Sequence, residues 1–156
     1  MPHDDFTTEM EALAIYEGRG INKLIDLDRD LNAMLLERLH PGTMLSQHPD
    51  RKQRAEITGR ILLDLHKTPP PAGHNLPHFQ NWMHDAFGDV RSCEDLERSR
   101  PYLDQMPPAQ AMMDTLMAPE EPQLLLHGEL HHWNILDDET RSWMAIDPKG
   151  VIGAVS

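Results

Sequence analysis

Hydrophobic side chains recur at helical spacing near the N-terminus, at Phe6, Met10, Leu13 and Ala14. This spacing predicts a helix that starts near Asp5 and ends before Gly18. A second stripe with the same period lies further along the chain, at Ile57, Ile61, Leu62 and Leu65. It predicts a longer helix from about Asp50 to Lys67, with its apolar side in the core.

Shorter apolar runs predict strands. Ile21 to Leu27 and Asn32 to Leu39 flank the polar turn Asp28-Arg29-Asp30, a pattern typical of a β-hairpin. The sequence His40-Pro41-Gly42 then interrupts the pattern and indicates a boundary between two parts of the molecule.

The last third of the chain carries a second group of short apolar runs. Leu124 to Leu126 and Ser142 to Ile146 have the length and composition of strands, and Ile135-Leu136 is a third short piece. The polar residues Asp137 to Thr140 predict the turn before the last of these strands. This stretch therefore predicts a hairpin with polar residues at its ends.

The middle of the chain is predicted to be helical. Thr68 to Pro77 contains three consecutive prolines and predicts a stiff linker. Three helical segments follow: Phe79 to Phe87, one that begins near Glu94 and is interrupted at Pro101, and one that starts at Pro107 and runs to Met117.

Charge narrows the classes of partner. The chain has 156 residues and a net charge of −12, which argues against a nucleic acid or an anionic membrane as a partner. The negative charge would suit a cationic ligand. An equally good interpretation is that it only keeps the protein soluble. A single cysteine, Cys93, excludes an intrachain disulfide. With a polar, acidic N-terminus and no long apolar run, the expected location is the cytoplasm.

Three oxygen-bearing side chains in the last third favour phosphoryl transfer: Glu129, Asn134 and Asp147. Such a reaction needs a carboxylate that orients the attacking hydroxyl and hard oxygen ligands for magnesium. In protein kinases the catalytic base and the magnesium-binding asparagine are five positions apart, as Glu129 and Asn134 are here. Asp147 then resembles the second magnesium ligand, at the end of the next strand.

A cluster of histidines allows a different interpretation. His127, His131 and His132 surround Glu129 and could bind zinc, with the carboxylate as the base of a hydrolase. Their spacing is not that of H-E-x-x-H on a helix, and Asn134 would have no role. A zinc-dependent hydrolase therefore remains the weaker alternative.

Two stretches, LLLHGELHHWNIL and AIDPKG, resemble the signature motifs of the aminoglycoside and hydroxyurea phosphotransferases, the streptomycin kinase group of the kinase-like fold. The usual forms there are H-G-D-L-H, three residues and N-[IV]-L, and later I-D-P-K-G. The similarity extends upstream, where EALAIYEGRGINKLIDLD and LLERLHPGTML resemble that family's first helix, next strand and hinge. The combination is specific and covers nearly the whole chain.

The resemblance implies an α+β, protein-kinase-like fold. Residues 1–40 would be a helix-plus-hairpin remnant of the N-terminal lobe, and residues 41–156 the helical C-terminal lobe with the catalytic hairpin, incomplete at its end. The backbone of Glu37 and Leu39 in the hinge would bind adenine. Glu11 would occupy the position that pairs with a strand lysine; the alternative is a capping box between Glu11 and Thr8.

The activity implied by the resemblance is ATP-dependent phosphorylation of a hydroxyl on streptomycin or a related small, cationic molecule, which confers resistance. Glu129 would act as the base, and Asn134 and Asp147 would hold Mg²⁺ on ATP. The family uses Asp where this chain has Glu129, and it carries a phosphate-covering loop, a strand lysine and terminal helices beyond the ends of this sequence. An inactive fragment or pseudoenzyme that only binds ligands is therefore the alternative, and self-association through surface left by missing helices is expected.

Overall fold

The computed structural model describes residues 5–92, 96–116 and 122–154. Its helices are α1 (Asp5–Tyr16), α2 (Arg51–Leu65), α3 (Phe79–Ser92), α4 (Leu96–Leu103) and α5 (Met106–Leu116), with a short 3-10 helix η1 (Leu45–Gln47). Its strands are β1 (Leu24–Asp28), β2 (Ala33–Leu36), β3 (Pro41–Met44), β4 (Leu124–Leu126), β5 (Ile135–Asp138), β6 (Ser142–Ala145) and β7 (Val151–Gly153). The mixture of helices and small antiparallel sheets confirms the α+β class.

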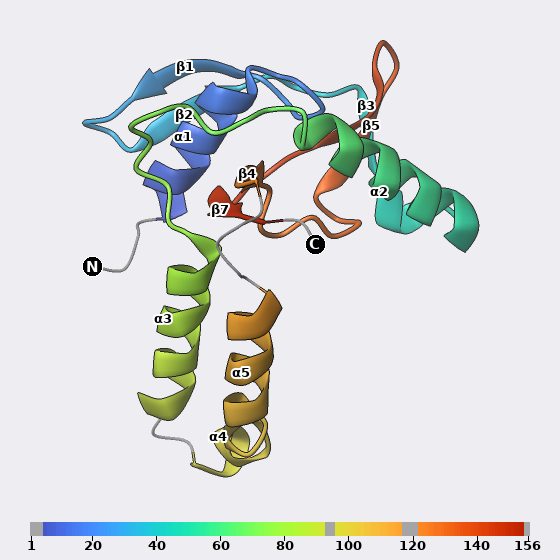
Figure 1. Cartoon of the computed structure of the whole chain (residues 1–156). Coiled ribbons are helices and arrows are strands. Elements are labelled where there is room, and N and C mark those ends of the chain that lie inside the picture. Colours follow the sequence, from blue (N-terminus) through green and yellow to red (C-terminus); the bar gives the residue numbers. More distant parts are fainter. Residues whose placement is uncertain (1–4, 93–95, 117–121, 155–156) are drawn as a thin grey trace.

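The strands form three small antiparallel sheets in the described part of the chain (Figure 1). One is the β1–β2 hairpin, the second has the order β3-β5-β6, and the third pairs β4 with β7. A parallel bridge between Ile21 and Ala145 connects the segment before β1 to the end of β6. The N-terminal hairpin is therefore joined through the backbone to the hairpin that carries the signature motifs.

Helix α1 lies at the centre of the hydrophobic core. Its apolar face contributes Ala12, Leu13 and Tyr16, all of them fully buried. They pack with side chains from both sides of residue 40, namely Ile21, Leu45, Ile61, Leu65, Leu76, Leu125, Ile135, Ala145 and Ile152. The division of the chain at residue 40 stays a prediction, and residues from both predicted parts share this one cluster.

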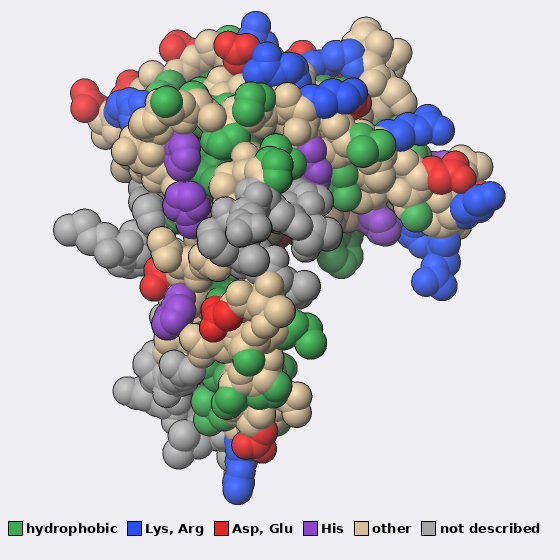
Figure 2. Space-filling model, in the orientation of Figure 1, with side chains coloured by type: hydrophobic (Ala, Val, Ile, Leu, Met, Phe, Trp, Pro, Cys, Tyr) green, Lys and Arg blue, Asp and Glu red, His purple; other side chains and the backbone are tan. Residues whose placement is uncertain are grey.

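Helices α3, α4 and α5 form a helical arm that projects from the rest of the molecule (Figure 1). On the face seen in Figure 2, hydrophobic side chains lie at the surface of this arm. Tyr102 and Met112 are 63% and 65% exposed, while Met106 and Met113 are buried. None of the described helices is both long enough and apolar enough to cross a membrane.

Most predicted elements are present with shifted ends. The first helix, the first hairpin, the long helix capped by Asp50 and the proline-containing linker are confirmed. The first helical segment of the arm continues to Ser92 instead of Phe87. Cys93, Glu94 and Met117 lie outside the described residues, so the expectations about them stay predictions.

Four details of the sequence prediction were wrong. The second strand ends at Leu36 rather than Leu39, and the supposed break at Pro41 begins β3, because pairing with β5 supplies its hydrogen bonds. Asp137 and Asp138 belong to β5, so the turn comes later than expected. Pro101 lies inside α4, where it removes one hydrogen bond without ending the helix. The pairing of β4 with β7 was not predicted at all.

Candidate functional site

The two signature motifs form interlocking turns. The carbonyl oxygen of His127 accepts a hydrogen bond of 2.7 Å from the N–H of Lys149. Gly128 and Gly150 both have positive φ, at +83° and +67°. A Cβ atom on Gly150 would lie 2.7 Å from the carbonyl oxygen of Thr8, so helix α1 rests directly on this turn. Glycine is required there because a larger residue would be strained and would clash with backbone.

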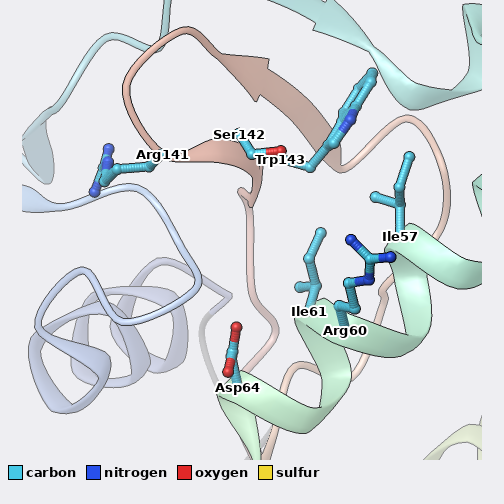
Figure 3. A pocket seen from close by; sticks show the side chains of 7 residues that line it. All are labelled: Ile57, Arg60, Ile61, Asp64, Arg141, Ser142 and Trp143. Carbon is cyan, nitrogen blue, oxygen red and sulfur yellow. The ribbon is translucent and has the colours of Figure 1, made fainter.

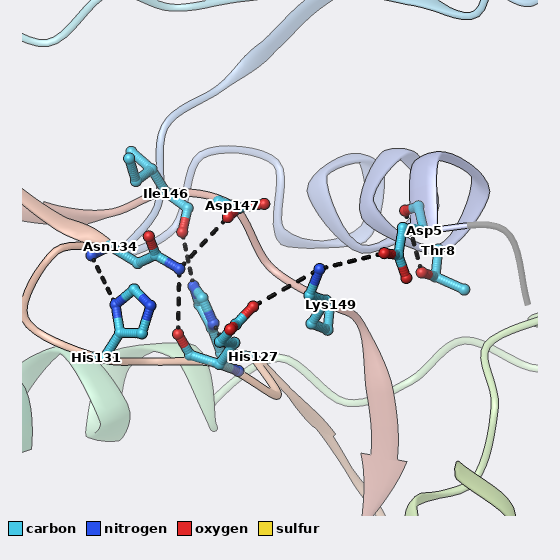
Figure 4. A network of polar contacts seen from close by, with 9 residues as sticks. Asp5, Thr8, His127, His131, Asn134, Ile146, Asp147 and Lys149 are labelled. Atoms are coloured by element: carbon cyan, nitrogen blue, oxygen red, sulfur yellow. Dashed lines mark hydrogen bonds and ion pairs between the residues drawn. The ribbon is translucent and has the colours of Figure 1, made fainter. Parts of the chain in front are cut away.

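This packing brings Asn134 and Asp147 together (Figure 4). The side-chain nitrogen of Asn134 donates to the carbonyl oxygen of Glu129 at 3.2 Å and to Oδ2 of Asp147 at 3.5 Å. These two bonds fix which way the amide points. They leave Oδ1 of Asn134 as an oxygen that could bind a metal ion, next to the carboxylate of Asp147.

Asp147 has an unusual backbone conformation. Its φ is +57°, in the left-handed region that residues other than glycine seldom adopt. The chain directly before it is held in place, because the N–H of Ile146 donates to the carbonyl oxygen of Asn134 at 2.9 Å. Such strain costs of the order of 1 kcal/mol and is typical of functional sites.

His127 connects the backbone of Glu129 to the segment that carries Asp147. Its Nε2–H donates to the carbonyl oxygen of Ile146 at 3.0 Å, and its Nδ1 accepts from the N–H of Glu129 at 3.3 Å. A carbonyl can only accept and a backbone N–H can only donate, so the ring is neutral. Burial lowers the pKa of His127 to about 4, although nearby hydrogen bonds and Asp147 oppose that shift. These contacts give His127 a structural role between the two turns.

The carboxylate of Glu129, the predicted base, lies at the surface of this network. Its Oε2 is 3.6 Å from Nζ of Lys149. The same Nζ lies 3.5 Å from Oδ2 of Asp5. Burial by itself would lower the pKa of Lys149, but the carboxylates of Asp5, Glu129 and Asp147 raise it overall. The Glu129 side chain is 43% exposed, so it is open to a ligand from solvent.

A cleft of about 490 Å³ lies next to these residues. It is lined by the hinge segment, residues 36–39, and by Glu9, Asn22, Pro41, Gly42, Leu136, Ile146 and Asp147. Glu37 and Leu39, the predicted adenine-binding residues, thus share a cleft with Asp147. The N–H of Glu37 donates to the carbonyl oxygen of Lys23, whereas the Glu37 carbonyl and the Leu39 N–H have no hydrogen-bond partner among the described residues.

The cleft also contains a carboxylate that sequence reasoning missed. Glu9 lines it, and burial together with the negative charge of Asp147 raises the pKa of Glu9. Glu11, the residue chosen from the sequence, instead accepts a hydrogen bond from the N–H of Asn75 at 2.8 Å. The capping box was wrong, because the Thr8 hydroxyl donates to Asp5 within the helix. Helical periodicity could have revealed Glu9. It lies one turn before the buried Leu13 and therefore on the same face of α1, whereas Glu11 does not.

The geometry does not favour zinc at the histidine cluster. Both ring nitrogens of His127 are engaged with backbone groups, and Nδ1 of His131 accepts from the N–H of Asn134 at 3.2 Å. Residues 5–92, 96–116 and 122–154 contain no group of three His, Cys, Asp or Glu side chains that could hold a metal ion.

A second, smaller hollow lies between α2 and the start of β6 (Figure 3). Its volume is about 170 Å³, and it is lined by Ile57, Arg60, Ile61, Asp64, Arg141, Ser142 and Trp143. Arg141 also reaches the hinge, because its guanidinium lies 2.7 Å from the Glu37 carboxylate. This ion pair therefore attaches the hinge to the tip of the β5–β6 hairpin.

Comparison with known proteins gives one consistent result. Residues 2–156 match the family model described as aminoglycoside/hydroxyurea antibiotic resistance kinase. The chain is 29% identical to streptomycin 6-kinase of Streptomyces griseus, with 98% of this chain and 49% of that protein aligned. It is 30% identical to hydroxyurea phosphotransferase of Kitasatospora aureofaciens, with 98% and 45% aligned. With streptomycin 3''-kinase of Klebsiella pneumoniae the identity is 34%, over 78% and 43%. The chain thus spans about half the length of these curated relatives.

Proposed function

Because the chain belongs to the aminoglycoside/hydroxyurea antibiotic resistance kinase family, we propose that it is an ATP-dependent phosphotransferase. Its acceptor would be a hydroxyl group of a streptomycin-like aminoglycoside or a related small molecule, and phosphorylation would inactivate the drug. The observation that carries the proposal is the meeting of Asn134 and Asp147 beside the hinge-lined cleft, on the same turns as Glu129.

The residues of the cleft fit a nucleotide. Apolar side chains for the faces of a purine come from Leu36, Leu39, Leu136 and Ile146, and backbone groups of Glu37 and Leu39 are available for its edge. Asn134 Oδ1 and the Asp147 carboxylate are hard oxygen donors, the ligands that Mg²⁺ prefers. When bound, Mg²⁺·ATP would supply the phosphoryl group and neutralise charge that develops on it. Glu9 is the carboxylate of α1 that would face this site.

Glu129 would accept or orient the proton of the acceptor hydroxyl. The interaction of its backbone N–H with His127 and the bond from Asn134 to its carbonyl fix the main chain, while the side chain stays accessible. Lys149, at 3.6 Å, would hold the carboxylate at the surface of the site. The carboxylates of Asp5, Glu129 and Asp147 around Lys149 make this region acidic. Such a region suits a cationic acceptor, and so does the net charge of −12.

A second candidate is a member of the family that binds nucleotide without turning it over. Glu129 supports it: one extra methylene relative to Asp displaces the carboxylate, and a shift of about 1 Å at a transfer site can cost on the order of a hundredfold in rate. Its ion pair with Lys149 would also have to open before the side chain reached a hydroxyl.

One experiment separates these candidates. Thermal unfolding is followed with and without Mg²⁺·ATP, and phosphate transfer to streptomycin and to hydroxyurea is then measured. A ligand that binds only the native state raises the transition temperature. A rise together with transfer supports the kinase; a rise without transfer to streptomycin or to hydroxyurea supports the binding-only form. If nucleotide leaves the transition unchanged and no transfer occurs, both proposals are wrong.

A further inference from the structure

Lys149 lies between the hinge-lined cleft and the predicted base. Its Nζ is 3.6 Å from Oε2 of Glu129. It also interacts electrostatically with two carboxylates that line the cleft, those of Asp147 and Glu9. Figure 4 shows the lysine side chain between the network around Asn134 and the start of α1. A group that moves from a nucleotide in the cleft to a hydroxyl at Glu129 therefore passes close to this ammonium group.

The first part of the Lys149 side chain is fixed on the turn that carries Glu129. The backbone N–H of Lys149 donates to the carbonyl oxygen of His127 at 2.7 Å. A Cβ atom on Gly128 would lie 2.9 Å from Cβ of Lys149 and 3.7 Å from its Cγ, so the lysine passes directly over that glycine. The start of the side chain thus stays next to Glu129, whichever group the ammonium binds.

The ammonium group itself is held loosely. Its ion pairs with Glu129 and Asp5 measure 3.6 Å and 3.5 Å, longer than the roughly 2.8 Å of a strong charge-assisted hydrogen bond. The two carboxylates are 43% and 81% exposed, and ion pairs between accessible groups contribute little to stability. The ammonium group can therefore exchange these partners for an oxygen of a bound ligand at little cost.

Transfer at this place brings negative charges together. The terminal phosphoryl group of a nucleotide is negatively charged, and on its way to the acceptor it meets the carboxylates of Asp147 and Glu129. A cation aimed at the moving group reduces the repulsion and stabilises the charge that develops in the transition state. Lysine suits this role because its ammonium group carries three donors on a flexible stem.

We propose that Lys149 is a catalytic residue whose ammonium group leaves Glu129 and donates a hydrogen bond to an oxygen of the phosphoryl group during transfer. The inference rests on the proposed phosphotransferase function and deepens it. In this step the bond between the γ-phosphorus of ATP and its bridging oxygen breaks, and the electron pair leaves with ADP. The acceptor oxygen forms the new bond to phosphorus, and its proton passes to the Glu129 carboxylate. Lys149 keeps its own protons throughout.

The test uses aluminium fluoride, which together with Mg²⁺·ADP mimics a phosphoryl group during transfer. Titration calorimetry, with streptomycin or hydroxyurea present as acceptor, gives the factor by which aluminium fluoride tightens the binding of Mg²⁺·ADP. Lys149→Met removes the charge and keeps most of the side-chain volume, so this factor should fall by about 10- to 100-fold relative to the wild type. The affinity for Mg²⁺·ADP alone should stay within about twofold. Lys52→Met, at a position on α2 that is 86% exposed, is the matched control and should keep the wild-type factor.

A second variant, Asp5→Asn, distinguishes a role in transfer from a structural bridge. It weakens the contact between Lys149 and α1 but leaves the ammonium group in place, so the wild-type factor should be retained. If Asp5→Asn lowers the factor as much as Lys149→Met does, or if Lys149→Met retains it, Lys149 does not contact the phosphoryl group and this inference alone is wrong. If the wild type binds neither Mg²⁺·ATP nor Mg²⁺·ADP, the proposed function fails and takes this inference with it.

Discussion

The two halves of the candidate site are built differently. The half predicted to bind metal, Asn134 and Asp147, is held in the fold by several hydrogen bonds, and Asn134 is only 8% exposed. In the acceptor half, the Glu129 side chain is 43% exposed and meets one cation, Lys149, at 3.6 Å. Under the proposed function, nucleotide binding would depend on the buried half, and the predicted base, Glu129, would lie in the exposed half. Changes in the first half should therefore affect binding, and changes in the second should affect turnover.

The largest effect is expected from Asp147→Ala. Losing the carboxylate removes the predicted magnesium ligand, which would be worth several kcal/mol, so the transfer rate should fall by about a thousandfold and Mg²⁺-dependent nucleotide binding should be lost. Steady-state kinetics and calorimetry measure the two effects. Asp114→Ala, at an exposed position on α5, is the matched control and should change neither. If Asp147→Ala still bound nucleotide in a Mg²⁺-dependent manner, the prediction that Asp147 is a metal ligand would be wrong.

Glu129→Asp tests the other half. Introducing the shorter carboxylate should raise the transfer rate by about a hundredfold, because the predicted base would then have the length of the aspartate in the motif that this chain resembles. Calorimetry should detect no more than about a twofold change in nucleotide affinity, since the side chain lies outside the buried network. A fall in transfer rate would indicate that the site has adapted to glutamate.

His127, which lies between the two halves, should make the free energy of unfolding depend on pH. The folded pKa of His127 is about 4 and lies below the unfolded value. Between these two values the unfolded chain binds more protons, so stability falls as the pH falls from about 6.5 towards 4. Between about pH 7.5 and pH 5 this group should cost about 2 kcal/mol of unfolding free energy.

Urea unfolding at those two pH values measures the effect. His127→Asn should lose that part of the pH dependence, while His84→Asn, an exposed position on α3, should keep it. An equal pH dependence in wild type and His127→Asn would contradict a neutral, buried ring.

The smallest effect concerns the support of α1, the helix that carries Glu9. The fully buried Tyr16 hydroxyl donates to the carbonyl oxygen of Leu125 at 3.1 Å, and burial raises the pKa of Tyr16. Tyr16→Phe leaves that carbonyl unpaired and should lower the unfolding free energy by about 1 kcal/mol. Tyr102→Phe is the matched control, because Tyr102 is 63% exposed and should stay within about 0.5 kcal/mol of wild type. If denaturant titrations gave the same change in unfolding free energy for Tyr16→Phe and Tyr102→Phe, the Tyr16 hydroxyl would not stabilise the fold.

Local pattern in the sequence determined the helices, the first hairpin and the signature motifs that carry the family resemblance. Each of these depends on residues close together in the chain: the stripe on α2, the polar turn Asp28-Arg29-Asp30 and the spacing of Glu129 and Asn134. Such signals survive without knowledge of the fold because periodicity and turn chemistry act over a few residues.

Tertiary structure alone decided the rest. β3 and β7 exist because β5 and β4 supply their hydrogen bonds, and no local signal marks those pairings. The packing of α1 on Gly150 turned Glu9 toward Asp147 and Glu11 toward Asn75. The contact of Lys149 with Asp5 likewise joins residues far apart in the chain. A side chain's partner depends on which surfaces meet, and contacts between residues far apart in the chain set that arrangement.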